Sequence, residues 1–206
     1  MKEKKSLDTT TEDKIKEAAR KVFYRKGFAA TRTRDIAEEA GINLALLNYY
    51  FRSKQKLFEL IMMEALGGLI KGLLVVLNDE HTTLEEKIQK IVARYIDVIT
   101  EEPEIPTFIV SEVRNNPRMM TDRLPIREVL DNSVFFRQHQ AAVAAGSISE
   151  PNPIHFFINL LGLVVFPFIV KPILMAGRGI DNSEFNQLMQ ERKKLVPVWI
   201  KMMMGS

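Results

Sequence analysis

Residues 33–54 contain two short stretches of helical periodicity separated by a glycine, and this pattern constrains the fold more than any other. Thr33 can cap the first helix, whose apolar stripe recurs at helical spacing as Ile36, Ala37 and Ala40. Gly41 follows directly, where a helix end favours a residue that tolerates positive φ. Asn43 is then a suitable N-cap for a second helix over residues 44–51. Two helices joined by such a turn form the helix-turn-helix plan, in which the second helix can enter a major groove.

The second of these helices divides into two faces. Four residues paired at i,i+4 make a face suited to burial: Leu46, Leu47, Tyr50 and Phe51. Four others make a face suited to base edges: Leu44, Ala45, Asn48 and Tyr49. Asparagine can pair bidentately with adenine, and small apolar groups can contact a thymine methyl group. On spacing alone, an ordinary buried helical hairpin explains the pattern equally well.

The distribution of charge favours the DNA-binding interpretation. The chain of 206 residues has a formal net charge of only +3, yet residues 1–60 hold 14 Lys and Arg against 9 Asp and Glu. A basic excess around the two helices is what phosphate binding requires. A hydrophobic content of 46% is ordinary for a globular protein, and the lack of cysteine excludes disulfides, thiolate metal sites and cysteine nucleophiles.

Two stretches bear on targeting and membranes. Residues 1–11 are polar and lysine-rich with no apolar region behind them, so we expect no secretory signal. Residues 156–170 are the nearest thing to a membrane span, but they fall short of the roughly 18–20 apolar residues that a bilayer needs. Asn159 and Pro167 also interrupt this run. We therefore expect a cytoplasmic protein with no membrane partner.

Helical periodicity continues along the whole chain, with no sustained strand alternation. Residues 1–10 are expected to be a disordered arm, and a helix over residues 11–26 ends at Gly27. Ser53 can cap a long helix over residues 54–77, and either Thr82 or Thr83 can open a capping box for a helix that ends near residue 100. Further helices are expected over residues 103–115, 126–145, 154–175 and 183–203. The fold class is therefore all-α with about nine helices.

The segment KIKEAARKVFYRKGFAATRTRDIAEEAGINLALLNYYFRSKQKLFE resembles the head of the TetR family of bacterial transcriptional regulators. The matching positions, at fixed spacing, are Ile15, Ala18, Ala19, Phe23, Gly27, Thr31, Arg34, Ile36, Ala37, Ala40, Gly41, Leu47, Tyr49, Tyr50, Phe51, Lys54, Leu57 and Phe58. The resemblance covers about a quarter of the chain. It implies a DNA-binding head over residues 1–53 and a helical domain over residues 54–206 that dimerises and encloses an effector pocket.

By position, the resemblance also implies which residues contact DNA. It assigns that role to residues in and before the two short helices: Thr33, Arg34, Asn43, Ala45, Asn48, Tyr49 and Tyr50. Lys54 matches a family position that holds phosphate. Leu44 and Asn48 depart from the family pattern, which often has a small or polar residue at the first position and an aromatic one at the second. Because both lie on the expected groove face, they indicate a different operator sequence.

Residues 154–170 are apolar around most of the helix circumference, so such a helix must be covered on every side. A homodimer interface built from the last two helices of each subunit would cover it, as the resemblance also implies. A central helix within one subunit is the alternative. The expected function is that of a ligand-responsive repressor, released from a palindromic operator by a largely apolar small molecule.

Candidate residues for the effector pocket lie among the helices expected between residues 54 and 168: Phe108, Glu112, Met119, Met120, Phe135, Phe136, His139 and Phe157. Methionine and phenylalanine suit adaptable apolar pockets, although such residues are more often part of an ordinary core. We expect no cofactor, metal site or catalytic residue, because the three histidines are scattered and no phosphate loop or nucleophile motif appears. A head that docks on protein and a helical enzyme are the alternative functions.

Overall fold

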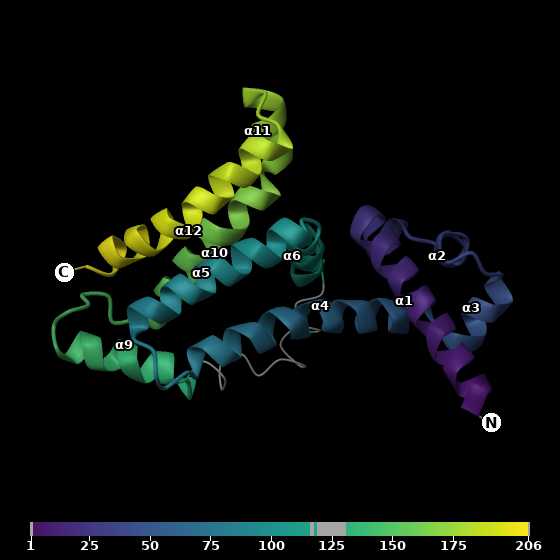
Figure 1. The fold of residues 1–206 in the computed structure, drawn as a ribbon, viewed down its shortest axis with the longest axis horizontal. Helices are drawn as coiled ribbons and strands as arrows, with labels where there is room; N and C mark the ends of the chain where they lie inside the picture. Colours follow the sequence, from purple (N-terminus) through teal and green to yellow (C-terminus); the bar gives the residue numbers. More distant parts are fainter. Residues whose placement is uncertain (1, 116–117, 119–130, 206) are drawn as a thin grey trace. The chain divides into compact units, whose positions relative to one another are not determined.

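The computed structural model describes residues 2–115, 118 and 131–205, with side chains from residue 10 onward. Within these ranges the secondary structure is helical, which confirms the all-α class (Figure 1). Ten helices are described, with the labels of Figure 1: α1 (Lys2–Ala30), α2 (Thr33–Glu39), α3 (Leu44–Tyr50), α4 (Lys54–Leu77), α5 (Leu84–Glu101), α6 (Ile105–Asn115), α9 (Val134–Ala144), α10 (Pro153–Ile169), α11 (Lys171–Arg178) and α12 (Asn182–Met204).

The contacts divide the chain into two compact units. The first comprises residues 1–68 and 107–115, and the second comprises residues 69–106 and 116–206. Helix α4 contributes its beginning to the first unit and its end to the second, and most of α6 belongs to the first. The division between a DNA-binding and an effector-binding domain at residues 53 and 54 stays a prediction about function.

The first unit is built on α1, whose apolar residues form a stripe at helical spacing. All five residues of that stripe are buried: Ile15, Ala18, Ala19, Val22 and Phe23. Helices α2, α3 and α4 add further buried residues to this unit, namely Ile36, Ala37, Leu47, Leu57, Phe58 and Ile61. Aromatic rings close this core, since Phe58 lies 5.0 Å from Phe23 and 5.4 Å from Phe108 between ring centroids.

The beginning of α1 differs from the expectation. The helix continues back to Lys2, where the sequence indicated a disordered arm. Lysine and glutamate favour helix, and propagation from the packed turn at Ile15 needs no new nucleus. At its other end the helical conformation breaks at Gly27, whose φ of 71° is the positive value expected of a helix-ending glycine.

The second unit has its own core around α5, which packs against α12, α10 and α9. The Thr83–Glu86 capping box opens α5, which decides between the two alternatives. Thr82 instead accepts a hydrogen bond through its hydroxyl from Lys87 Nζ at 2.9 Å, and its carbonyl accepts another at 2.7 Å. The buried ammonium also donates to the Asp79 carbonyl, so all three of its N–H groups hold the corner between α4 and α5.

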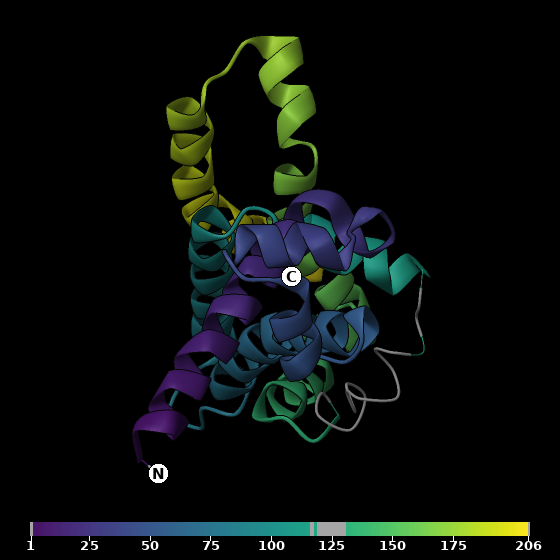
Figure 2. The same ribbon diagram turned by 90° about the vertical axis from the view of Figure 1, so that its right-hand side faces the viewer.

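The long helix expected over residues 154–175 is wrong, because the structure breaks it at Val170 into α10 and α11, bent by 54°. Pro172 explains the break, since its ring would clash with the carbonyl four residues earlier and it has no N–H to donate. Figure 2 shows α11 turning away from α10 before the chain returns as α12. Gly179 ends α11 with a φ of 69°, and Asp181 with Glu184 forms the capping box of α12.

Pro167 lies inside α10 and leaves the Leu163 carbonyl without its usual donor four residues on. Arg192 of α12 supplies the missing donor at 2.7 Å. Its guanidinium also lies over the Trp199 ring, 5.1 Å from the centroid. The proline is thereby tolerated, and the side chain that compensates for it joins the last two long helices.

Two segments satisfy the length and hydropathy expected of a membrane span. One is α4, of which 33% is buried over the apolar window, and the other is the bent pair of α10 and α11. The first half of α4 places Leu57, Phe58 and Ile61 in the core of the first unit. A core helix meets the same two criteria, so length and composition alone carry no membrane assignment.

Candidate nucleic-acid interface

The turn between α2 and α3 is built as the sequence predicts. Gly41 has a φ of 66°, and the Asn43 side chain accepts a hydrogen bond from Leu46 N at 2.8 Å, which caps α3. The predicted cap of α2 is wrong by one residue, because Thr33 is the first helical residue and Arg32 is the N-cap. Arg32 N donates to the Asp35 carboxylate at 2.9 Å, so the acidic residue in the first turn satisfies the helix start.

The Asp35 carboxylate is held in its ionised form. The hydrogen bond from the Arg32 backbone, and then the Lys26 ammonium at 3.1 Å, lower the pKa of this carboxyl. Negative charge at this point favours the α2 dipole and fixes the helix start against α1. The exposed guanidinium of Arg34 lies in the same first turn.

Three residues of the predicted groove face of α3 are exposed: Ala45, Asn48 and Tyr49. The Tyr49 side chain is 75% exposed and its ring meets that of Tyr50 edge to face, with 5.3 Å between the centroids. Leu47 is fully buried on the opposite face, as predicted. Leu44 and Tyr50 are half-buried, so they lie at the edge of the exposed face.

The Lys54 side chain is engaged within the head. Its Nζ donates to the Phe28 carbonyl at 2.9 Å and to the Thr31 carbonyl at 2.8 Å, and it lies 4.2 Å from the Phe28 ring centroid. An ammonium has three N–H donors, so these bonds leave one for a phosphate. The lysine therefore ties the end of α1 and the residue that follows it to the start of α4.

Further exposed basic residues flank the two short helices, and the sequence pattern did not single them out as candidate DNA contacts. Arg32 precedes α2, Arg52 lies between α3 and α4, and Lys56 lies in the first turn of α4; all three are exposed. The charge excess in residues 1–60 was the available signal, although it does not say which side chains are exposed.

The predicted pocket residues are divided between the two units. Phe108 and Glu112 belong to the first unit, where the Phe108 ring packs on Tyr24 and Phe58 and burial raises the pKa of the Glu112 carboxyl. Phe135 and Phe157 belong to the second, in an aromatic cluster with Phe156 at centroid distances of 4.8–5.3 Å. Phe136 is half-buried on α9. Met119 and Met120 lie outside the described residues.

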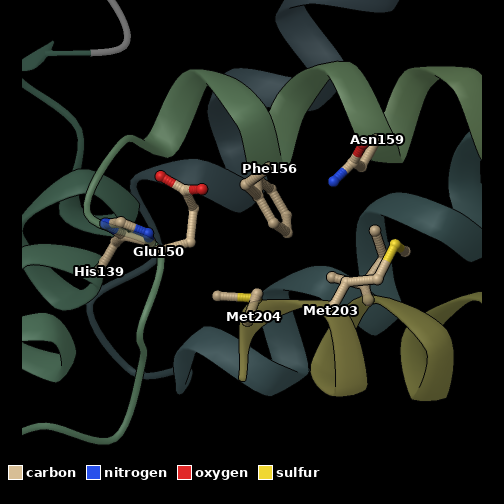
Figure 3. Close-up of a pocket in the computed structure, with 7 residues that line it drawn as sticks. His139, Glu150, Phe156, Asn159, Met203 and Met204 are labelled. Carbon is tan, nitrogen blue, oxygen red and sulfur yellow. The ribbon is translucent and has the colours of Figure 1, made fainter. Parts of the chain in front are cut away.

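His139 lines a recess of the second unit together with residues that the sequence did not single out. The others are Glu150, Phe156, Asn159, Ile200, Met203 and Met204 (Figure 3). They come from α9, the following loop, α10 and the end of α12. No periodicity could have revealed this set, because its members come from four separate segments.

The family model for "Bacterial regulatory proteins, tetR family" matches residues 15–61, which span the buried stripe of α1, both short helices and the start of α4. Residues 15–61 therefore have the pattern of a TetR-family DNA-binding head.

Similarity to individual proteins extends over more of the chain. A Bacillus subtilis (strain 168) protein named "Probable HTH-type transcriptional regulator YttP" is 27% identical over 171 residues, which cover 79% of each chain. The "HTH-type transcriptional repressor NicS" of Pseudomonas putida is 31% identical over 102 residues, 50% of this chain and 48% of its own. The fold resembles that of a tetR-family regulatory protein from Rhodococcus RHA1, with a TM-score of 0.69 and 18% identity over 92% of this chain and 96% of that chain. The chain is a DNA-binding transcriptional regulator with a helix-turn-helix head.

Proposed function

We propose that this TetR-family protein is a cytoplasmic, dimeric repressor that binds a palindromic operator and leaves it when a small molecule binds. The observation that carries DNA recognition is the exposed Tyr49, Asn48 and Ala45 face of a helix whose other side is anchored by buried Leu47. Asparagine and tyrosine can hydrogen-bond to base edges or phosphates, and alanine suits a thymine methyl group. The NicS relative, whose name describes a repressor, supports the sign of regulation.

The apolar surface of the last helices supports the dimer. On α10 an exposed stripe recurs at helical spacing: Ile154, Ile158, Leu161 and Ile169. On α12 a second stripe has the same character: Leu188, Leu195, Val198 and Met202. Each stripe is distinct from the buried face of its helix, and a second copy would remove both from water. Dimerisation through α10 and α12 is the arrangement that we expect, in place of a central helix within one subunit.

Release follows from the two-unit organisation. Helix α4 has residues in both units, so a ligand that prefers one arrangement of the units biases the arrangement of the heads. The ligand weakens operator binding only if it binds more tightly to the protein off DNA than to the protein on DNA.

Selection of the DNA fragments that the protein binds tests this proposal. The fragments come from a genomic pool that includes the DNA upstream of the protein's own gene. We expect the pool to converge on an inverted repeat whose affinity for the protein falls steeply as salt rises, because phosphate contacts release counterions. Selection without a shared sequence, or an affinity that does not change with salt, would contradict operator binding by this head.

A further inference from the structure

Helix α4 contains two adjacent glycines, Gly67 and Gly68, in its interior. Neither of them has a positive φ, so the backbone conformation does not demand glycine at either position. A glycine inside a helix is roughly fivefold less favourable than an alanine, because it has more backbone freedom to lose. Two glycines in succession are therefore a weak point of α4 that needs a reason.

Packing does not supply that reason. A Cβ atom added to Gly67 or Gly68 would meet no side chain and no other segment within 4 Å, and both residues are exposed. Gly72, one turn further on, is different, because a Cβ atom there would collide with the Arg94 guanidinium of α5. Steric room thus explains Gly72 and leaves the adjacent pair unexplained.

The position of the pair in the chain does offer a reason. The first unit includes α4 up to Gly68, and the second unit begins at Leu69. Leu66, which belongs to the first unit, is buried, and Leu69 packs against the core of the second unit. The side chains on either side of the glycines are thus held by different units, and the glycines have no side chain to join either core.

The chain also crosses between the units at residues 106–107 and 115–116, which are the two ends of α6. Helix ends have backbone groups without partners in the helix and they fray, so they yield more readily than a helix centre. The crossing in α4 lies in a helix interior, which would resist bending if its residues were ordinary helix formers. The two glycines stand at this crossing.

We propose that Gly67 and Gly68 form a hinge in α4 about which the first unit reorients relative to the second. Glycine pairs are among the recognised causes of sharp helix bends, and water can solvate the backbone that such a bend exposes. In the proposed function, this hinge is where a ligand in the second unit sets the orientation of the DNA-binding head. Only that last step rests on the proposed function, because the motion of the hinge is measured without DNA or ligand.

Distances between two spin labels, measured by pulsed electron paramagnetic resonance, test the hinge. The chain has no cysteine, so Glu38→Cys on α2 and Gln140→Cys on α9 place one label at an exposed site of each unit. An excess of unlabelled protein keeps the measured pairs within one copy. We expect a broad distribution of distances in the glycine form, and a width reduced by about half in Gly67→Ala/Gly68→Ala, because alanine favours the unbent helix.

Gly177→Ala on α11 is the matched control, since it adds the same methyl group to another exposed helical glycine with open space around it. It should leave the width unchanged. A second pair of labels, at Glu101→Cys and Gln140→Cys, lies within the second unit and gives the width that the labels themselves contribute. The two alanines in α4 should not alter that width.

Hydrogen exchange of the α4 backbone amides gives an independent readout of the same weak point. We expect the amides of residues 67–72 to exchange at least about fivefold more slowly in Gly67→Ala/Gly68→Ala, because alanine disfavours the locally open helix. The amides of α5 should exchange as before.

Any of four results would overturn the hinge. The distances between the units could be as narrowly distributed as those within the second unit, or equally distributed in the glycine and alanine forms. Gly177→Ala could narrow the distribution as much as the two alanines in α4 do, or those alanines could leave the exchange of α4 unchanged. Failure to select an operator would alter none of these measurements, so the hinge and the proposed function are tested separately.

Discussion

Tyr49 is the aromatic residue of the predicted groove face of α3. Its ring is 75% exposed on α3, so it contributes little to the core and is available to DNA. We expect Tyr49→Ala to weaken operator binding at least about tenfold, the effect of losing one good base or phosphate contact. The free energy of unfolding should change little. Fluorescence anisotropy with labelled operator and urea denaturation measure the two quantities.

Val75→Ala is the matched control for Tyr49, since Val75 is a similarly exposed residue on α4, outside the head's short helices. It should leave operator affinity unchanged. Unaltered binding by the Tyr49 variant would mean that another face of α3 meets the DNA.

Lys54 illustrates a residue with a structural role that its family position did not indicate. Its Nζ donates to the carbonyls of Phe28 and Thr31 at the end of α1, so Lys54→Met should leave them without this donor and lower the free energy of unfolding by about 1–3 kcal/mol. Lys56→Met, at an exposed neighbour in the same helix, should cost much less. Chemical denaturation of the two variants measures the difference. Equal stability of both would show that solvent replaces the Lys54 bonds at no cost.

The sequence could identify exposed residues of α3 because a buried helix face leaves its opposite side to solvent. Asn48 and Tyr49 follow from that periodicity, and Leu47 is its buried counterpart. It could not identify Glu150 or Met203 beside His139, because tertiary packing alone brings a loop and a distant helix end together. Nor could it separate Phe108 from Phe135, which the contacts assign to different units.

At the scale of elements, Arg192 and Pro167 form a pair whose coupling can be measured. Arg192→Met removes the donor to the Leu163 carbonyl, and we expect it to lower the free energy of unfolding by about 1–3 kcal/mol. Pro167→Ala restores the N–H that Leu163 lacks within α10. Arg192→Met should therefore cost less in the Pro167→Ala background. A double-mutant cycle by denaturation measures this difference, and additive effects would contradict the compensation.

Helix ends were predictable where a local signal sets them and not where tertiary packing does. Asn43, Thr83 and Gly41 act through bonds or dihedral angles within a few residues, and their predicted roles are confirmed. The break at Val170 was missed although Pro172 was visible, because the apolar run through residues 154–170 suggested one continuous helix.

At the scale of the whole molecule, α4 and α6 are the helices that have residues in both units. The first part of α4 carries Leu57 and Phe58 in the first core, and its last residue, Leu77, is buried in the second. A ligand in the second unit can act on the head through this helix or through α6, most of which belongs to the first unit. The effect on DNA also depends on there being two heads, which makes the dimer the point to test.

Ile158 on α10 tests the dimer most directly, since its side chain is 61% exposed in the chain alone and would be buried by a second copy. Ile158→Glu places a charge in that interface, where it has no water and no partner, so we expect sedimentation velocity to report monomers. Operator affinity should then fall roughly 10²-fold, because the second half-site is no longer bound intramolecularly. Val75→Glu, an equally polar change at an exposed position of α4, should preserve both the dimer and the affinity. A dimer that survives Ile158→Glu would move the interface away from α10, and a monomer that keeps full affinity would show that one head suffices for the operator.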